Sequence, residues 1–134
     1  YGERCISRRV GQIFIESALH KKEIFVDGDG EEKLDFTYIK DLLGGIIQVI
    51  VEPKSKNEIF NLTYGSAKPI LSMIQILKEY FPNVIVKNKP RDALTPIRGT
   101  LSIKKAKKLI NYSPSWPLEK GYPEYIKWYK SIFN

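Results

Sequence analysis

The chain has 134 residues, of which 43% are hydrophobic and 28% are charged, and its formal net charge at pH 7 is +7. A chain of this length commonly forms one domain around one hydrophobic core, so we expect residues 1–134 to be a single unit. No apolar run approaches the ~20 residues that a membrane-spanning helix requires, so the sequence predicts no such helix.

The chain begins YGERCISRRV, which lacks an initiating Met and the apolar stretch of a signal peptide. We interpret the chain as a fragment of a longer protein. Cys5 is the single cysteine and cannot form an internal disulfide, which fits a reducing cytoplasm. Together with the single histidine, His20, it falls short of a zinc ligand set. The sequence therefore predicts a cytoplasmic protein without a metal site, and it offers no nucleophile–base pair for catalysis.

The positive net charge would suit an anionic partner. Lys and Arg are spread along the chain, however, and no aromatic–basic RNA-binding signature accompanies them. Charge alone therefore favours a nucleic-acid-binding domain only weakly, and we keep that function as an alternative.

The first elements are a helix and a strand that ends in a glycine turn. Apolar residues recur at helical spacing over residues 7–20, with Ser7 as a candidate N-cap. Residues 23–30, EIFVDGDG, read as a short strand followed by a turn, because Gly28 and Gly30 can adopt the positive φ that larger residues avoid.

The turn is expected to return the chain as a second strand, residues 33–39, with alternating side chains on its two faces. Asp41 can then cap a helix that continues to about Val51. Gly44 and Gly45 weaken that helix by roughly 0.5–1 kcal/mol each, so their presence predicts close packing against another element.

Further elements follow along the chain. Residues 58–63, EIFNLT, read as a buried strand, and Pro69 begins a helix with the sequence PILSMIQILKEYF. Residues 83–87, NVIVK, form another expected strand. A long polar connection over residues 88–101 comes next, and loops of this length inside compact domains are often functional. Ser102 can cap a short helix after it.

The C-terminal segment is rich in aromatic residues. Pro123 requires a helix here to begin late or to bend. Five side chains fall on one helical face and are interpreted as core, not as a stacking platform for bases: Tyr122, Tyr125, Ile126, Tyr129 and Phe133.

Five stretches in this order resemble one family over the whole chain: YGER, GDGEEKLDFTYIKDL, IFNLTYG, KPRD and SIKKAKKLINYSPSWPLEKGYPEYIKWY. They look like the C-terminal half of NAD-dependent sugar-nucleotide epimerases and dehydratases, the extended short-chain dehydrogenases. The resemblance implies a mixed α/β fold of short strands and helices, lacking the N-terminal Rossmann half. It also implies NAD or NADP bound by that missing half.

The same resemblance implies that the family's glycine-rich loop and its Tyr-x-x-x-Lys pair lie before Tyr1, which is not the catalytic tyrosine. No such glycine-rich loop occurs in these residues, and GDG between two strands has the wrong context for a dinucleotide loop. We therefore expect no catalytic residue and no cofactor-binding residue in this chain, and we expect it to be inactive alone.

Two implied binding regions surround the glycine turn. In the family the strand before GDG runs beneath the nucleotide base, which points to Val26 and Asp27. The strand after GDG usually carries an arginine that reaches the substrate diphosphate, and Leu34 stands in its place here. Lys33 is the nearest possible replacement. Asp35 matches a retained position whose role is structural, holding the turn and neighbouring backbone.

The KPRD segment matches a second binding region of the family. By resemblance, Lys89 stands where an arginine binds phosphate, and Asp92 stands where an acid contacts ribose. Lysine lacks the planar fork of arginine, so Arg98 in the extra TPIRGT stretch is an alternative phosphate ligand, with Arg91 as another. Arg9 matches a position from which related enzymes direct a basic side chain at the sugar nucleotide.

The combined interpretation is the sugar-nucleotide-binding part of an NAD(P)-dependent epimerase or dehydratase. Its partners would be a nucleotide-diphosphate sugar and the protein's own Rossmann half, with self-association of the isolated fragment. An alternative is a noncatalytic binding or scaffold module that keeps the fold and has lost diphosphate recognition, which Leu34 favours.

Overall fold

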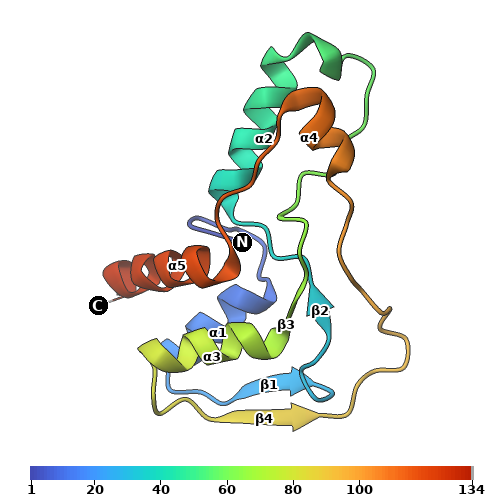
Figure 1. Cartoon of the computed structure of the whole chain (residues 1–134). Coiled ribbons are helices and arrows are strands. Elements are labelled where there is room, and N and C mark those ends of the chain that lie inside the picture. The colour runs from blue at the N-terminus through green and yellow to red at the C-terminus, as the bar shows by residue number, and fades with distance from the viewer. Residues whose placement is uncertain (134) are drawn as a thin grey trace.

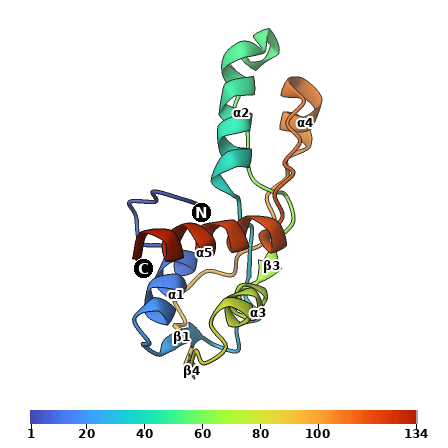
Figure 2. The ribbon, with the colours of Figure 1, turned by 90° about the vertical axis from the view of Figure 1, so that its left-hand side faces the viewer.

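The computed structural model describes residues 1–133. Its elements are α1 (Val10–Leu19), β1 (Ile24–Asp27), β2 (Lys33–Leu34), α2 (Ile39–Val51), the 3-10 helix η1 (Pro53–Ser55), β3 (Lys68–Pro69), α3 (Ile70–Tyr80), β4 (Val86–Lys89), α4 (Lys104–Ile110) and α5 (Leu118–Phe133). Helices α1, α3 and α5 form a base with β1 and β4, and α2 with α4 project from it (Figures 1 and 2). The expected mixed α/β fold of short strands and helices is confirmed.

Two small sheets replace the hairpin expected around the glycine turn. β1 pairs in parallel with β4, from Ile24 opposite Val86 to Asp27 opposite Lys89. β2 pairs antiparallel with β3 instead of with β1. The expected strand over residues 33–39 is thus limited to its first two residues, because only these have a partner strand.

The turn itself agrees with the expectation. Gly28 and Gly30 have φ values of 65° and 81°. A Cβ atom on Gly30 would lie 2.8 Å from Cγ of Leu71 in α3. Gly30 is therefore needed both for its backbone conformation and for the close approach of the turn to α3.

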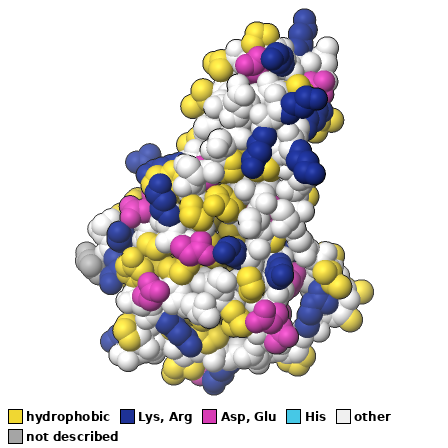
Figure 3. Space-filling view, in the orientation of Figure 1, with side chains coloured by type: hydrophobic (Ala, Val, Ile, Leu, Met, Phe, Trp, Pro, Cys, Tyr) yellow, Lys and Arg dark blue, Asp and Glu magenta, His cyan; other side chains and the backbone are white. Residues whose placement is uncertain are grey.

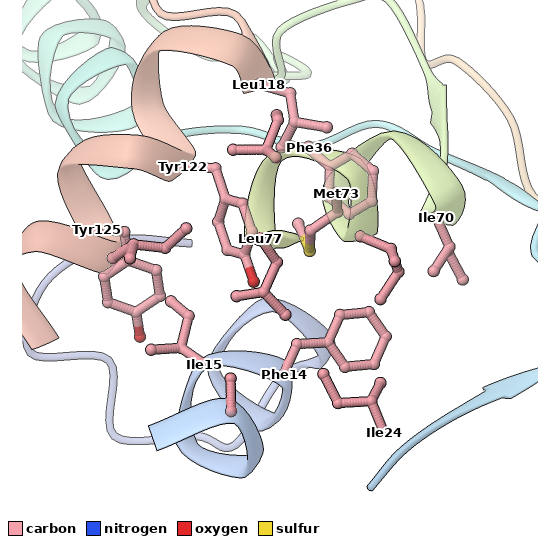
Figure 4. Packing of buried hydrophobic residues seen from close by; sticks show 14 of the residues in the cluster. Phe14, Ile15, Ile24, Phe36, Ile70, Met73, Leu77, Leu118, Tyr122 and Tyr125 are labelled. Atoms are coloured by element: carbon pink, nitrogen blue, oxygen red, sulfur yellow. The ribbon is translucent and has the colours of Figure 1, made fainter. Parts of the chain in front are cut away.

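The main core lies between α1, α3 and α5, with β1 beneath them (Figure 4). The aromatic stripe is confirmed as core for Tyr122, Tyr125, Ile126 and Tyr129, which are all at most 4% exposed, whereas Phe133 is 55% exposed. The late start expected from Pro123 is wrong, because α5 already begins at Leu118. A proline near the helix start removes one backbone hydrogen bond, and burial of the aromatic face outweighs that loss.

A second, smaller core joins α4 to α2 in the projection. Ile103, Ala106, Ile110 and Tyr112 are its buried members. The predicted close packing is confirmed for Gly45, where a Cβ atom would lie 2.8 Å from Cε2 of Tyr112, and is wrong for Gly44, which faces open space.

Three expected helix caps are absent at their predicted places. α1 has Arg9 at its N-cap, α4 has Ile103, and neither has a side-chain capping bond, so Ser7 and Ser102 lie outside these roles. Asp41 lies inside α2, whose N-cap is Tyr38. Its carboxylate instead accepts hydrogen bonds from the N–H groups of Ser115 at 2.8 Å and Trp116 at 2.9 Å.

The buried strand predicted over residues 58–63 is wrong. The segment has no strand partner among residues 1–133, and Ile59 is 86% exposed. Its backbone is instead close to the start of α4, where the Asn61 amide donates to the carbonyl oxygen of Ser102 at 3.1 Å. An apolar sequence forms a strand only when a neighbouring strand accepts its hydrogen bonds.

The outer face of α2 is apolar and exposed. Its side chains are 41–76% exposed: Leu43, Ile46, Ile47, Ile50 and Val51. Charged side chains, by contrast, are distributed over both the base and the projection (Figure 3), as expected from the spread of Lys and Arg along the sequence. None of the helices described over residues 1–133 is long and apolar enough to cross a membrane.

Candidate functional site

A cavity of about 850 Å³ lies where the start of α1, the chain around β2 and the end of the 88–101 connection meet. Three of the residues predicted for substrate binding line it: Arg9, Asp27 and Arg98. They come from positions almost 90 residues apart in the sequence, and the fold brings them to one hollow. Leu34 also lies in the wall, where it supplies apolar surface and no hydrogen-bond donor.

A second hollow of about 410 Å³ adjoins the first, because Asp27, Glu32 and Arg98 line both. Lys33 and Arg91, the two other candidate phosphate ligands, lie in this second hollow. The Arg91 guanidinium donates to the carbonyl oxygen of Thr95 at 2.7 Å, which holds it within its own loop.

The other three predicted binding residues are not in the lining of either hollow. Val26 is 2% exposed and belongs to the core. Lys89 is exposed, with its Nζ 4.3 Å from the ring centroid of Phe25. Asp92 is exposed, and its Oδ1 accepts the N–H of Leu94 at 2.9 Å. These three thus lie outside the lining that contains Arg9 and Arg98, and their binding roles stay predictions.

Asp35 fastens the loop that carries Arg98. Its Oδ1 accepts the N–H of Gly65 at 3.0 Å, and its Oδ2 accepts the N–H of Leu101 at 3.2 Å. Thr100 adds a third tie by accepting the N–H of Ala67 at 2.8 Å. The expected structural role of Asp35 is confirmed, although it holds backbone 30 and 66 residues away and not the glycine turn. Arg98 therefore lies just before an anchored point of the chain.

The two arginines before α1 differ in their surroundings. Arg8 forms an ion pair with Glu16 at 3.0 Å, whereas Arg9 and Arg98 have no ion-pair partner among residues 1–133. A hydrogen bond from Gln12, with smaller contributions from Arg8 and Tyr129, lowers the pKa of Glu16. Glu16 thus stays ionised and holds Arg8, while Arg9 remains available to a ligand.

Several lining residues were not singled out from the sequence. Arg8, Glu32, Thr37, Thr63 and Thr95 all face the larger cavity. Arg8 stands beside Arg9 and Glu32 lies within the GDGEEK turn, so proximity to predicted residues could have marked them. Thr95 likewise begins the TPIRGT stretch of Arg98, whereas Thr37 and Thr63 carry no local signal, because their places depend on how the segments fold against one another.

Comparison with known proteins agrees with this fold. Residues 1–63 match the model of the NAD dependent epimerase/dehydratase family. The resemblance to this family that was seen in the motifs of the chain is confirmed.

Relatives in this family are longer than the chain. A UDP-glucuronate 4-epimerase of Thermodesulfobacterium geofontis is 34% identical over 122 residues, which are 87% of this chain and 36% of that protein. UDP-glucuronic acid decarboxylase 1 of Arabidopsis thaliana is 29% identical over 129 residues, 94% of this chain and 29% of that protein. The chain thus spans well under half the length of these relatives.

Solved structures show the same fold. The UDP-glucose 4-epimerase of Thermotoga maritima, solved with UDP-glucose, matches with a TM-score of 0.88 at 25% identity over 100% of this chain and 44% of that one. The UDP-glucuronic acid 4-epimerase of Bacillus cereus, solved with UDP-glucuronic acid and NAD, matches with a TM-score of 0.89 at 25% identity over 98% and 43%.

Proposed function

We propose that this chain is the nucleotide-sugar-binding part of an NAD(P)-dependent nucleotide-sugar epimerase or dehydratase. The observation that carries the proposal is the cavity of about 850 Å³ with Arg9 and Arg98 in its wall. A diphosphate requires several converging donors, and each well-placed charged hydrogen bond contributes about 1.5–3 kcal/mol. Arg9 and Arg98, which have no ion-pair partner among residues 1–133, supply such donors.

The residues divide by the part of the ligand they would meet. Arg9 and Arg98 would hold the diphosphate, and Asp27 would lie at the end of the strand beneath the base. Val26 would support that strand from the core side, where it is 2% exposed. Lys89 and Asp92 remain in the proposed set by resemblance alone, since neither lines the cavity.

The cofactor implied by the family does not fit the residues described. A dinucleotide phosphate binds where a glycine-rich loop opens a helix, whereas the Gly28–Gly30 turn leads into β2. We therefore assign NAD or NADP to another part of the intact enzyme. This chain would hold the nucleotide and diphosphate of the substrate in place.

Calorimetric titration of the full-length protein with UDP-, GDP-, CDP- and dTDP-sugars tests the proposal. We expect saturable binding of at least one of them, weakened by replacement of Arg9 or Arg98. Absence of binding across the panel would favour a noncatalytic scaffold module. Leu34, which offers no donor in the cavity wall, is the observation that favours this second function.

Residues 1–134 produced alone are expected neither to bind the cofactor tightly nor to be catalytically active. Because no glycine-rich loop opens a helix in these residues, we expect neither tight NAD binding nor turnover of any sugar nucleotide. Calorimetry with NAD and NADP provides the measurement, with the full-length protein as the positive control. Micromolar NAD affinity of the isolated chain would show that the boundary of the cofactor site is drawn wrongly.

Residues 1–134 produced alone are also expected to self-associate or to be only marginally stable. The outer face of α2 is apolar and exposed, and we propose that it packs against the protein's own Rossmann half. Sedimentation velocity on the chain and on an Ile47→Glu/Ile50→Glu double variant measures the effect. We expect the double variant to sediment as a smaller species.

Ile85→Glu is the matched control, because Ile85 is 56% exposed and lies just before β4, away from α2. A stable monomer for the unaltered chain, unchanged in both variants, would contradict the assignment of this face.

A further inference from the structure

Glu32 lines the cavity, and its carboxylate forms no ion pair or hydrogen bond with the side chains and backbone described over residues 1–133. It lies in the turn between Gly30 and β2, and its carbonyl oxygen accepts the N–H of Ile70 at 3.1 Å, which fixes it beside the start of α3. Its side chain is half-buried and lines both hollows. The backbone thus holds Glu32 firmly at the junction of the two hollows.

The carboxylate of Glu32 is not satisfied by the protein. Its Oε1 is buried without a hydrogen-bond partner among residues 1–133, and none of their ion pairs includes Glu32. Burying a charged oxygen without a donor costs free energy, so such groups are normally paired. A donor from outside these residues would remove this cost.

The other two acids of the same cavity differ from Glu32. Asp35 uses both oxygens to hold the backbone of Gly65 and Leu101. Asp27 is exposed, so water can solvate its carboxylate. Glu32 is therefore the acid in this wall that combines partial burial with an unused oxygen. The hydroxyl of Thr63, which also lines the cavity, is likewise buried without a partner.

We propose that Glu32 accepts hydrogen bonds from carbohydrate hydroxyl groups of the nucleotide sugar, an inference that rests on the function proposed above. A carboxylate repels the diphosphate and therefore faces a part of the ligand that carries donors. Ribose and the transferred sugar both present hydroxyl groups. Arg98 and Glu32 line the same two hollows. A cation that can bind phosphate therefore lies near an acceptor that can bind hydroxyl groups.

This assignment moves the hydroxyl-binding role away from Asp92. The family resemblance points to Asp92 as the acid that contacts ribose, but Asp92 is exposed and outside the cavity lining. Its Oδ1 is already occupied by the N–H of Leu94. Glu32 has the place in the cavity wall that Asp92 lacks, and its Oε1 is buried without a partner among residues 1–133.

The test compares Glu32→Gln with the unaltered full-length protein by calorimetry, using UDP-glucose, UDP, 2′-deoxy-UDP and 3′-deoxy-UDP as probes. Gln keeps the size of the side chain and removes its charge. We expect Glu32→Gln to lose about tenfold or more in affinity for UDP-glucose, the scale of a charged hydrogen bond. Glu79→Gln, at an exposed position of α3 outside the lining of both hollows, is expected to change nothing.

The probes separate the two sources of hydroxyl groups. If Glu32→Gln binds UDP more weakly than the unaltered protein does, and this difference disappears with a deoxy analogue, Glu32 contacts the ribose. If Glu32→Gln loses affinity for UDP-glucose but not for UDP, Glu32 contacts the transferred sugar. Unchanged affinity of Glu32→Gln for UDP-glucose, or an equal loss for all four probes, would overturn the proposal while leaving the proposed function standing. Failure of the unaltered protein to bind any nucleotide sugar would instead remove the proposed function itself.

Discussion

Replacing Arg98 by Ala in the full-length protein is expected to weaken nucleotide-sugar binding by roughly 1.5–3 kcal/mol, the scale of a charged hydrogen bond. Leu34 offers no donor in the cavity wall, so the negative charge of a diphosphate must be met by other groups. Arg98 lines the cavity without an ion-pair partner among residues 1–133, on a loop held in place by Asp35 and Thr100. Calorimetric titration with the best nucleotide sugar of the panel gives the affinities.

Three further variants make this result specific to Arg98. Arg91→Ala removes a guanidinium from the same loop that is already bonded to the carbonyl of Thr95, so we expect a smaller loss. Lys89→Ala should also weaken binding less, because Lys89 lies on the Phe25 ring and acts at most as a point charge. Leu34→Arg should be neutral or mildly strengthening. Unchanged affinity of Arg98→Ala together with lost binding in Lys89→Ala would show that Lys89, as the family resemblance indicates, binds the phosphate and that Arg98 does not.

Replacing Asp41 by Ala is expected to lower the free energy of unfolding by about 2–3 kcal/mol. The Asp41 side chain is 7% exposed and accepts two backbone N–H groups, those of Ser115 and Trp116. Alanine leaves both donors without their charged acceptor and frees the segment that leads from α4 to α5. Urea unfolding of the full-length protein, followed by tryptophan fluorescence, measures the change.

Two variants test whether the effect comes from these hydrogen bonds. Asp41→Asn keeps one acceptor oxygen, so its free energy of unfolding should fall by about half as much as that of Asp41→Ala. Asp29→Ala removes a carboxylate of the same type from an exposed turn, where it accepts only the N–H of Glu31 at 3.0 Å, and should change stability little. Equal, small losses for Asp41→Ala and Asp29→Ala would show that Asp41 does not hold the 115–116 segment.

The sequence by itself determined the elements whose signals are local. Helical spacing of apolar side chains predicted α1, α3 and the buried stripe of α5, because a helix face is a property of neighbouring residues. The glycines of the GDG turn predicted its positive φ values, since few other residues adopt them. Motif order identified the family. Arg9 was marked by a matching family position and Arg98 by the extra TPIRGT stretch, and both line the cavity.

The tertiary structure decided what depends on residues distant in the sequence. The alternation of side chains that predicts a strand does not indicate which strand it will pair with. In the structure β1 pairs with β4 and not with β2, and residues 58–63 form no strand. Asp41 had the local pattern of a cap, yet it bonds a segment more than 70 residues away. Glu32 carried no signal beyond its place in the GDGEEK turn, because its unsatisfied oxygen exists only once the turn packs against α3. Local sequence sets backbone preference and apolar faces, whereas pairing, burial and the convergence of charges depend on long-range packing.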